Sequence, residues 1–328
     1  MLPAEKEAIL IQNITPSYRI KDGESLAHWQ EKARKKLSEL LGLDRFEDCE
    51  TVVSVEYDEE RADFREIRFK VQTERDLFVP CHLLLPKENT GDLPLMICLQ
   101  GHSTGMHISL GKPLYEGDEE TIAGDRDFAI QAISQGYCAL AIEQRGFGEL
   151  GGTPDPQCHE ASMTALLTGR TLIGARVWDI KKIIDGITRD FSHLFDIHSI
   201  YCMGNSGGGT ATFYATALEE RIKGAIPSCA FCTYKDSIGA MRHCQCNFIP
   251  HIAEYFDMAE LGGMIAPRPL VIVSGQKDRI FPIVPAKSEY ERLMSLYYTE
   301  APDNCVHFIG EEGHRYYRGA WEVFNKIR

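Results

Sequence analysis

Short apolar runs alternate with longer amphipathic stretches over most of the 328-residue chain. Strands that alternate with helices are joined by crossovers, and such crossovers favour a parallel sheet. Consecutive crossovers are expected to be right-handed, which places helices on both faces of the sheet. The pattern therefore predicts an α/β protein with a mostly parallel, doubly wound sheet. The apolar runs of this region cover residues 93–99, 137–142, 200–203, 224–226, 270–273 and 306–309.

The chain before residue 94 has a different rhythm. Apolar residues at near-helical spacing, from Leu26 to Leu41, are followed by Gly42, which is a suitable helix stop. Three strand-like runs at 51–57, 64–73 and 77–85 are typical of a β-meander at the edge of a sheet. We expect a helical N-terminal extension over residues 1–50 and a single α/β domain over residues 51–328.

One segment of that domain, residues 228–262, is cysteine-rich and poorly periodic, so we expect it to form a cap or pocket wall. The helical stretch 175–189 carries apolar residues on one side and is interpreted as a core helix.

Charge and cysteine usage narrow the range of partners. The formal net charge of −13 disfavours binding to nucleic acid. No apolar run reaches transmembrane length, and the N-terminus lacks the layout of a secretory signal, so no membrane partner is expected. Eleven cysteines cannot all pair internally, and several lie in apolar runs. We therefore expect free thiols and a cytoplasmic location, and leave homo-oligomerisation open.

The segment Gly204-Asn205-Ser206-Gly207-Gly208 fits the G-x-S-x-G pattern of a nucleophile elbow. A strand-like run precedes it and a helix-like run follows it, which is the context that the pattern requires. In such an elbow the serine lies on a tight turn with its hydroxyl exposed, and the outer glycines allow the helix to approach the strands. The sequence thus indicates Ser206 as a nucleophile.

A serine nucleophile needs a base, and the base needs an orienting acid. Asp278 follows the buried run 269–273, and His314 lies in a glycine-bracketed loop after the run 305–309. The order serine, acid, histidine is that of α/β-hydrolase sheets. Asp278 and His314 are therefore the predicted acid and base, whereas His307, inside a strand-like run, is interpreted as structural. Other acids with less suitable positions are Asp257, Glu311 and Glu312.

A tetrahedral intermediate also needs two backbone N–H donors for its oxyanion. The N–H of Gly207 is the first candidate, and the loop after the run 95–99 offers the N–H of His102, with Ser103 behind it. Arg145 is interpreted as a residue that ties down a loop. Four further residues are expected at the substrate pocket, namely Ser103, Asn205, Cys229 and His243.

Two cysteine pairs, Cys229/Cys232 and Cys244/Cys246, raise the question of zinc. Only one residue separates the second pair, which is a poor match to common zinc spacings. Cys229 and Cys232 also lack the strand-to-helix setting of a redox pair. Thiols lining a pocket wall are the simpler interpretation, so neither a metal nor an organic cofactor is expected.

The chain resembles the α/β-hydrolase superfamily, and within it the branch of acetyl xylan esterase-like and dienelactone hydrolase-like proteins. The resemblance covers roughly residues 60–328. The segments that carry it are Gln100–His102, Arg145–Gly148, Gly174–Asp179, Gly204–Gly208, Asp278 and Gly313-His314.

Several positions depart from this pattern. Multi-specific acetyl xylan esterases carry glutamine, glutamine and glutamate where this chain has Phe147, Gly207 and Arg315. Dienelactone hydrolases use a cysteine nucleophile where this chain has Ser206. The resemblance therefore implies the catalytic apparatus more firmly than the substrate.

With this apparatus we expect a serine-dependent carboxylic ester hydrolase that forms an acyl-enzyme. The resemblance implies small acyl esters, such as acetyl groups on carbohydrates, as substrates. Two alternatives stay open at this point. One is a serine peptidase of the prolyl-oligopeptidase type, for which 328 residues leave little room for a gating domain. The other is a non-catalytic binding module on a hydrolase scaffold, since a fold does not fix a function.

Overall fold

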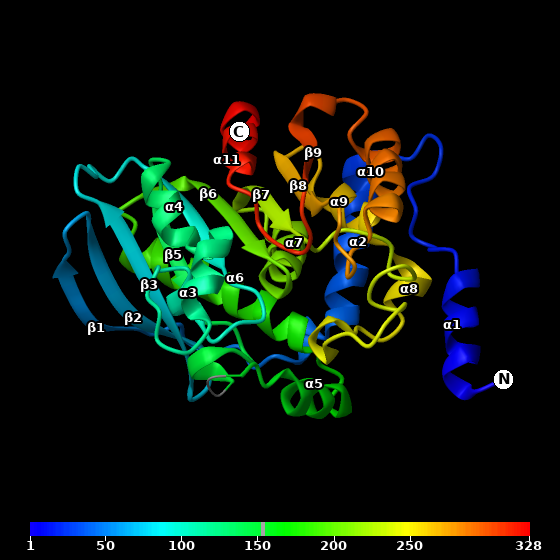
Figure 1. Ribbon diagram of the computed structural model, residues 1–328, viewed down its shortest axis with the longest axis horizontal. Helices are drawn as coiled ribbons and strands as arrows, with labels where there is room; N and C mark the ends of the chain where they lie inside the picture. The colour runs from blue at the N-terminus through cyan, green and yellow to red at the C-terminus, as the bar shows by residue number, and fades with distance from the viewer. Residues whose placement is uncertain (152–154) are drawn as a thin grey trace.

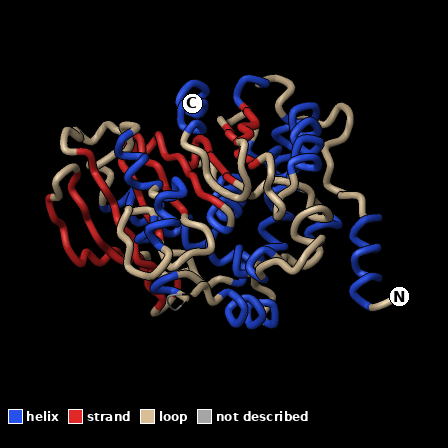
Figure 2. The backbone as a smooth tube through the Cα atoms, in the orientation of Figure 1, coloured by secondary structure: helices blue, strands red, loops and turns tan. Residues whose placement is uncertain are grey.

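The computed structural model describes residues 1–151 and 155–328, and in these residues nine strands form one sheet with the order β1-β2-β3-β5-β4-β6-β7-β8-β9 (Figures 1 and 2). The first three strands form an antiparallel meander at one end, and β3 joins the rest by antiparallel pairing with β5. From β5 to β9 all neighbouring strands are parallel. The strands are β1 (Val53–Glu60), β2 (Phe64–Glu74), β3 (Leu77–Pro86), β4 (Pro94–Leu99), β5 (Cys138–Ile142), β6 (Asp196–Asn205), β7 (Ile222–Ser228), β8 (Leu270–Gly275) and β9 (Cys305–Gly310).

Helices cover both faces of the sheet, because side chains of the central strands alternate between two apolar clusters. In β4, Leu95 and Ile97 belong to one cluster, whereas Met96 and Cys98 belong to the other. The first cluster lies under α2, α6, α7 and α9, and the second under α4 and α11. The helices are α1 (Pro3–Asn13), α2 (Leu26–Leu41), α3 (Asp118–Thr121), α4 (Phe128–Ser134), α5 (Cys158–Leu167), α6 (Leu172–Asp190), α7 (Gly207–Leu218), α8 (Ile252–Tyr255), α9 (Met258–Ile265), α10 (Ile283–Tyr297) and α11 (Gly319–Ile327).

The predicted fold class is confirmed: the sheet is mostly parallel and has helices on both sides. Each strand-like run of the sequence corresponds to one observed strand, and α6 contains the predicted core helix. Residues 1–50 hold α1 and α2. Between β7 and α9 the chain makes turns and two short helices, whereas α9 itself is buried along its whole length. Within the described ranges, no helix combines the length and the apolar character needed to cross a bilayer.

Candidate functional site

The three predicted catalytic residues lie at the carboxyl ends of parallel strands. Ser206 stands between β6 and α7, Asp278 follows β8, and His314 follows β9. Parallel strands end at the same edge of a sheet, which is where ligands bind in open α/β folds. The topology alone therefore brings these three residues to one edge.

Ser206 occupies a backbone conformation that non-glycine residues rarely adopt, with φ 55° and ψ −121°. Close packing around the turn enforces it. A Cβ built on Gly208 would lie 2.1 Å from the carbonyl oxygen of Leu99, and one on Gly204 would lie 2.6 Å from the backbone of Gly208. The Ser206 N–H also donates to the carbonyl of Ser228 at 2.9 Å. The sharp turn projects the serine out of the sheet edge, as the elbow pattern predicts.

Asp278 and His314 are joined by a hydrogen bond of 2.8 Å between Asp278 Oδ2 and His314 Nδ1. The other carboxylate oxygen, Oδ1, accepts the N–H groups of Ile280 and Phe281 at 2.8 and 3.1 Å. Burial would raise the pKa of Asp278, but the hydrogen bond and charge of His314 and these backbone donors lower it below its usual value. Asp278 is thus held as an anion that orients the imidazole.

The imidazole of His314 is fixed on a second side by Phe281, whose ring stacks on it with an interplanar angle of 16°. Its other nitrogen, Nε2, is buried and has no hydrogen-bond partner among the residues that the structure describes. This nitrogen could therefore act as a base and accept the proton of a neighbouring hydroxyl.

A cavity of about 310 Å³ lies above the elbow, and both Ser206 and His314 open into it. Residues 241–244, before α8, supply one wall. The lining residues are His102, Arg126, Ser206, Met241, Arg242, His243, Cys244, Ile280 and His314.

The loop after β4 lies against the elbow, as an oxyanion loop would. A Cβ built on Gly101 would come within 2.6 Å of the Asn205 carbonyl oxygen and 3.1 Å of the Ser206 Cβ. Gln144 Nε2 donates to the Gln100 carbonyl at 2.6 Å, and Gln100 Nε2 donates to Glu143 at 2.7 Å. The backbone that carries the N–H of His102 is therefore anchored beside Ser206.

Of the four expected pocket residues, His243 lines the cavity, and the structure places the other three elsewhere. Asn205 is fully buried and its Oδ1 accepts the hydroxyl of Ser228 at 2.9 Å. The Cys229 thiol donates to the carbonyl of Arg315 at 3.2 Å, and the Ser103 hydroxyl donates to Gly101 within its own loop. Their side chains hold the elbow and its neighbouring loops.

Sequence reasoning did not single out Arg126, Met241, Arg242 or Ile280 as lining residues, whereas Cys244 was expected on a pocket wall with the other thiols of residues 229–246. The signal of the first four is weak, because none belongs to a recognisable motif: Arg126 ends the short π-helical segment Ile122–Arg126, and the others stand in loops. Arg126 is the most informative of them. It is half-buried at the end of the turn before α4, and no carboxylate in the described part of the chain forms an ion pair with it. Its pKa is lowered by burial, and the nearby charge of Arg315 acts in the same direction.

Two residues interpreted as structural have contacts that fit this role. His307 Nε2 lies 2.9 Å from the Ser274 hydroxyl of the neighbouring strand, and burial lowers the pKa of His307 to about 4. Arg145 pairs with Asp179 and Glu74, at 2.6 and 2.7 Å. It ties the loop after β5 to α6 and β2.

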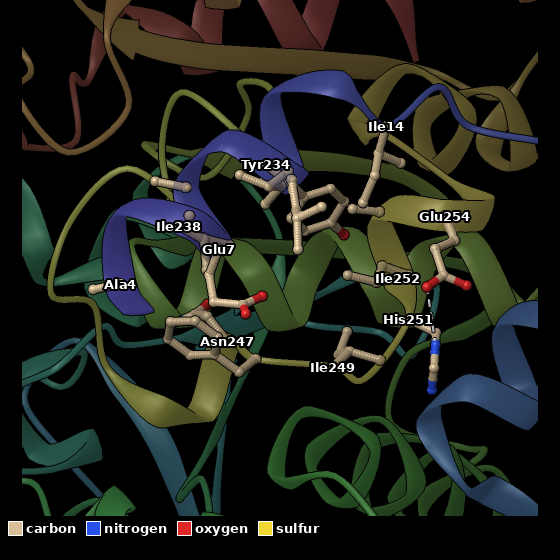
Figure 3. A pocket seen from close by; sticks show the side chains of 16 residues that line it. Ala4, Glu7, Ile14, Tyr234, Ile238, Asn247, Ile249, His251, Ile252 and Glu254 are labelled. Atoms are coloured by element: carbon tan, nitrogen blue, oxygen red, sulfur yellow. Dashed lines mark hydrogen bonds and ion pairs between the residues drawn. The ribbon is translucent and has the colours of Figure 1, made fainter. Parts of the chain in front are cut away.

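A larger cavity of about 560 Å³ lies between α1 and the segment 234–254. Figure 3 shows its largely apolar lining, with side chains such as Ile14, Tyr234 and Ile249 around it and the ion pair of His251 and Glu254 at one end. None of the three predicted catalytic residues lines it. The smaller cavity, which Ser206 and His314 line, is therefore the candidate site.

Among residues 1–151 and 155–328, two groups of side chains are close enough to share a metal ion. One consists of Cys229, Asp278 and His314, in which the Asp278–His314 hydrogen bond already uses the donor atoms. The other brings the ring of His102 together with three thiols, those of Cys158, Cys244 and Cys246.

Comparisons with known proteins agree with this architecture. Residues 8–163 match the Abhydrolase family. YtaP, a presumed hydrolase of Bacillus subtilis (strain 168), is 27% identical over 234 residues, which are 70% of this chain and 75% of YtaP.

Two solved structures extend the comparison. A presumed acetyl xylan esterase from Bacteroides fragilis NCTC 9343 superposes with a TM-score of 0.77 at 16% identity, over 92% of this chain and 80% of the other. A glucuronoyl esterase from Solibacter usitatus gives a TM-score of 0.68 at 15% identity, over 96% and 97% of the two chains. The chain therefore has the α/β-hydrolase fold, and the expected resemblance in fold to acetyl xylan esterase-like proteins is confirmed.

Proposed function

We propose that this protein is a serine-dependent carboxylic ester hydrolase that acts through an acyl-enzyme. The observation that carries the proposal is the Asp278–His314 hydrogen bond beside the Ser206 elbow, with Ser206 and His314 on one cavity. In the proposed reaction His314 Nε2 removes the Ser206 proton as the hydroxyl attacks the ester carbonyl. Asp278 keeps the proton on Nδ1 and stabilises the imidazolium that forms.

The oxyanion that develops on the carbonyl oxygen would be held by the N–H groups of Gly207 and His102. His314 then returns its proton to the leaving alcohol, and a water molecule that it activates releases the acyl group. The cavity of about 310 Å³ fits a small acyl group better than a long chain. The carbohydrate esterases among the structural neighbours support esters of sugars as substrates.

The test compares wild type with Ser206→Ala on p-nitrophenyl acetate. We expect kcat to fall at least about 10³-fold, because removal of a triad nucleophile leaves only the binding and oxyanion contributions. Ser295→Ala is the matched control, since Ser295 is exposed on α10 and, in the part of the chain that the structure describes, its hydroxyl bonds only to the Arg292 carbonyl of that helix. A fluorophosphonate probe should label wild type and the control but not Ser206→Ala.

Two results would reject the proposal: a Ser206→Ala rate within a few-fold of wild type, or no probe labelling of an intact wild-type protein. A peptide anilide cleaved as efficiently as the acetyl ester would contradict the assignment to esters while keeping the nucleophile.

A further inference from the structure

Behind the cavity, three thiols surround one imidazole nitrogen. His102 Nε2 lies 3.3 Å from Cys246 Sγ and 3.9 Å from Cys158 Sγ, and with Cys244 Sγ all four donor atoms lie within 4.8 Å of one another. They come from the loop after β4, the first turn of α5, and the short helix at 245–247 with Cys244 directly before it. Segments far apart in sequence thus bring together one nitrogen and three sulfur atoms, all of which are common metal ligands.

The spacing of the donor atoms fits a tetrahedral zinc ion. Zinc bonds of about 2.3 Å to sulfur and about 2.0–2.1 Å to nitrogen put a sulfur and a nitrogen about 3.6 Å apart at tetrahedral angles, and two sulfurs about 3.8 Å apart. The observed sulfur–nitrogen distances of 3.3 and 3.9 Å lie on either side of that value. Three cysteines and one histidine form a common closed zinc set.

The charge balance of the surroundings is an independent observation. Arg176 is 1% exposed, and within residues 1–151 and 155–328 no carboxylate forms an ion pair with it. Its guanidinium donates to the Arg145 carbonyl and, from Nη2, to Cys158 Sγ at 3.4 Å. A buried cation needs an anionic partner. Neutral thiols cannot supply that charge, whereas three thiolates around a divalent cation leave one negative charge beside the guanidinium.

We propose that His102, Cys158, Cys244 and Cys246 bind one Zn²⁺ ion. All four ligands come from the protein, which is typical of a structural site rather than a catalytic one. Ligation through Nε2 would leave the proton of His102 on Nδ1, a ring atom that faces Gly207. The ion would thereby fix the loop that carries the proposed oxyanion donor and the wall that carries Cys244. This inference does not depend on the proposed esterase activity.

The test is the metal content of the full-length protein, purified without a metal-binding tag or chelator from zinc-supplemented medium. We expect about one zinc ion per chain. Cys158→Ser and Cys246→Ser should lose most of it, because each removes one thiolate ligand. Cys232→Ser is the matched control, since its thiol is buried in the same wall segment but bonds to the Pro282 carbonyl, and it should keep the zinc.

A second measurement needs no variant. Replacement of zinc by Co²⁺ in wild type should give the visible bands of tetrahedral cobalt with thiolate charge transfer. Wild-type protein that contains no zinc and gives no such bands would overturn the inference. Zinc retained by both ligand variants would also overturn it, as would a disulfide among Cys158, Cys244 and Cys246 found by mass spectrometry. If a variant does not fold, the wild-type zinc content and cobalt spectrum decide the question.

Discussion

The imidazole of His102 lies against the backbone of Gly207: a Cβ built on that glycine would come within 3.0 Å of the ring atoms Cε1 and Nδ1. Gly207→Ala should therefore push the ring and its loop away from the elbow. We expect kcat/KM on p-nitrophenyl acetate to fall about 10²-fold, the loss that a displacement of about 1 Å at a reacting centre can cause.

The control for this substitution is Gly124→Ala. A Cβ at Gly124 would meet no atom of the described residues within 4 Å, and its φ of −77° suits alanine. Both variants should keep the far-UV circular dichroism of wild type. A Gly207→Ala enzyme with wild-type activity would contradict the prediction, because it would show that the loop can move while the N–H of His102 still serves as oxyanion donor.

Asp278→Asn should remove activity while the fold is retained. The oxygen of the new amide can still accept the N–H groups of Ile280 and Phe281, but the amide nitrogen then faces His314 Nδ1 and donates to it. The imidazole proton moves to Nε2, so that this nitrogen can no longer accept the serine proton. We expect kcat to fall about 10⁴-fold.

Thermal unfolding and steady-state kinetics would test this prediction together. Asp303→Asn, at an exposed position, serves as the control for the same chemical change. A loss of kcat below about ten-fold in Asp278→Asn would argue that the carboxylate does not orient the base.

Arg126 should favour esters that carry an anionic group. It lines the cavity without an ion-pair partner in the described chain, so that a substrate carboxylate could pair with it. A hydrogen bond to a charged group contributes about 1.5–3 kcal/mol, which corresponds to about 10–100-fold in kcat/KM. Arg126→Gln should lose this factor on a p-nitrophenyl hemisuccinate and almost nothing on the uncharged butyrate. Equal losses on both esters would instead assign Arg126 a structural role.

Glu143 should make stability depend on pH in the neutral range. Burial raises its pKa from 4.5 to about 7, although the N–H groups of Met106 and Glu149 act against this. Below pH 4.5 both folded and unfolded chains hold the proton. The unfolded chain loses this proton near pH 4.5, whereas the folded chain keeps it until about pH 7. The stabilisation of about 3 kcal/mol that is present at low pH is therefore lost as the pH rises from 4.5 through 7.

Glu143→Gln keeps the shape of the side chain and removes the titration. Its amide can bond to Gln100, whose Oε1 is buried and unpaired among the described residues, once the Gln100 amide turns over. The difference in unfolding free energy between variant and wild type should rise by about 3 kcal/mol from pH 4.5 to pH 8 in urea titrations. A constant difference would show that Glu143 titrates normally.

The sequence predicted the sheet well because its strands are buried and have short, distinct apolar runs. It also predicted that Ser206, Asp278 and His314 would lie at one edge, since strand order and parallel direction bring them there. The helix α5 was missed because its sequence has a weak amphipathic pattern, and in it only Cys158 and Ser162 are buried. For the same reason α1, which has no buried residue, was not delimited within the expected helical extension.

The pocket was less predictable, because its walls depend on how irregular loops fold. Arg126 belongs to no motif. Asn205 and Cys229 were expected at the pocket, but their side chains bond to Ser228 and to the Arg315 carbonyl. The cluster of His102 with three thiols could not be predicted for the same reason, because it also depends on how the loops fold. The cysteines of residues 229–246 show no zinc spacing by themselves, whereas His102 and Cys158 approach them from other parts of the chain. Only the three-dimensional structure joins them.

Cys244 lines the cavity above Ser206 and also belongs to the thiol cluster with His102. Any redesign of substrate range is constrained by this shared residue. Met241 and Arg242 are exposed and can be exchanged to reshape the entrance, whereas Cys244 and Cys246 anchor the same stretch of chain to the loop beside the elbow. Libraries that randomise residues 241–243 and retain the two cysteines would vary substrate selectivity while the loop beside the elbow keeps its position.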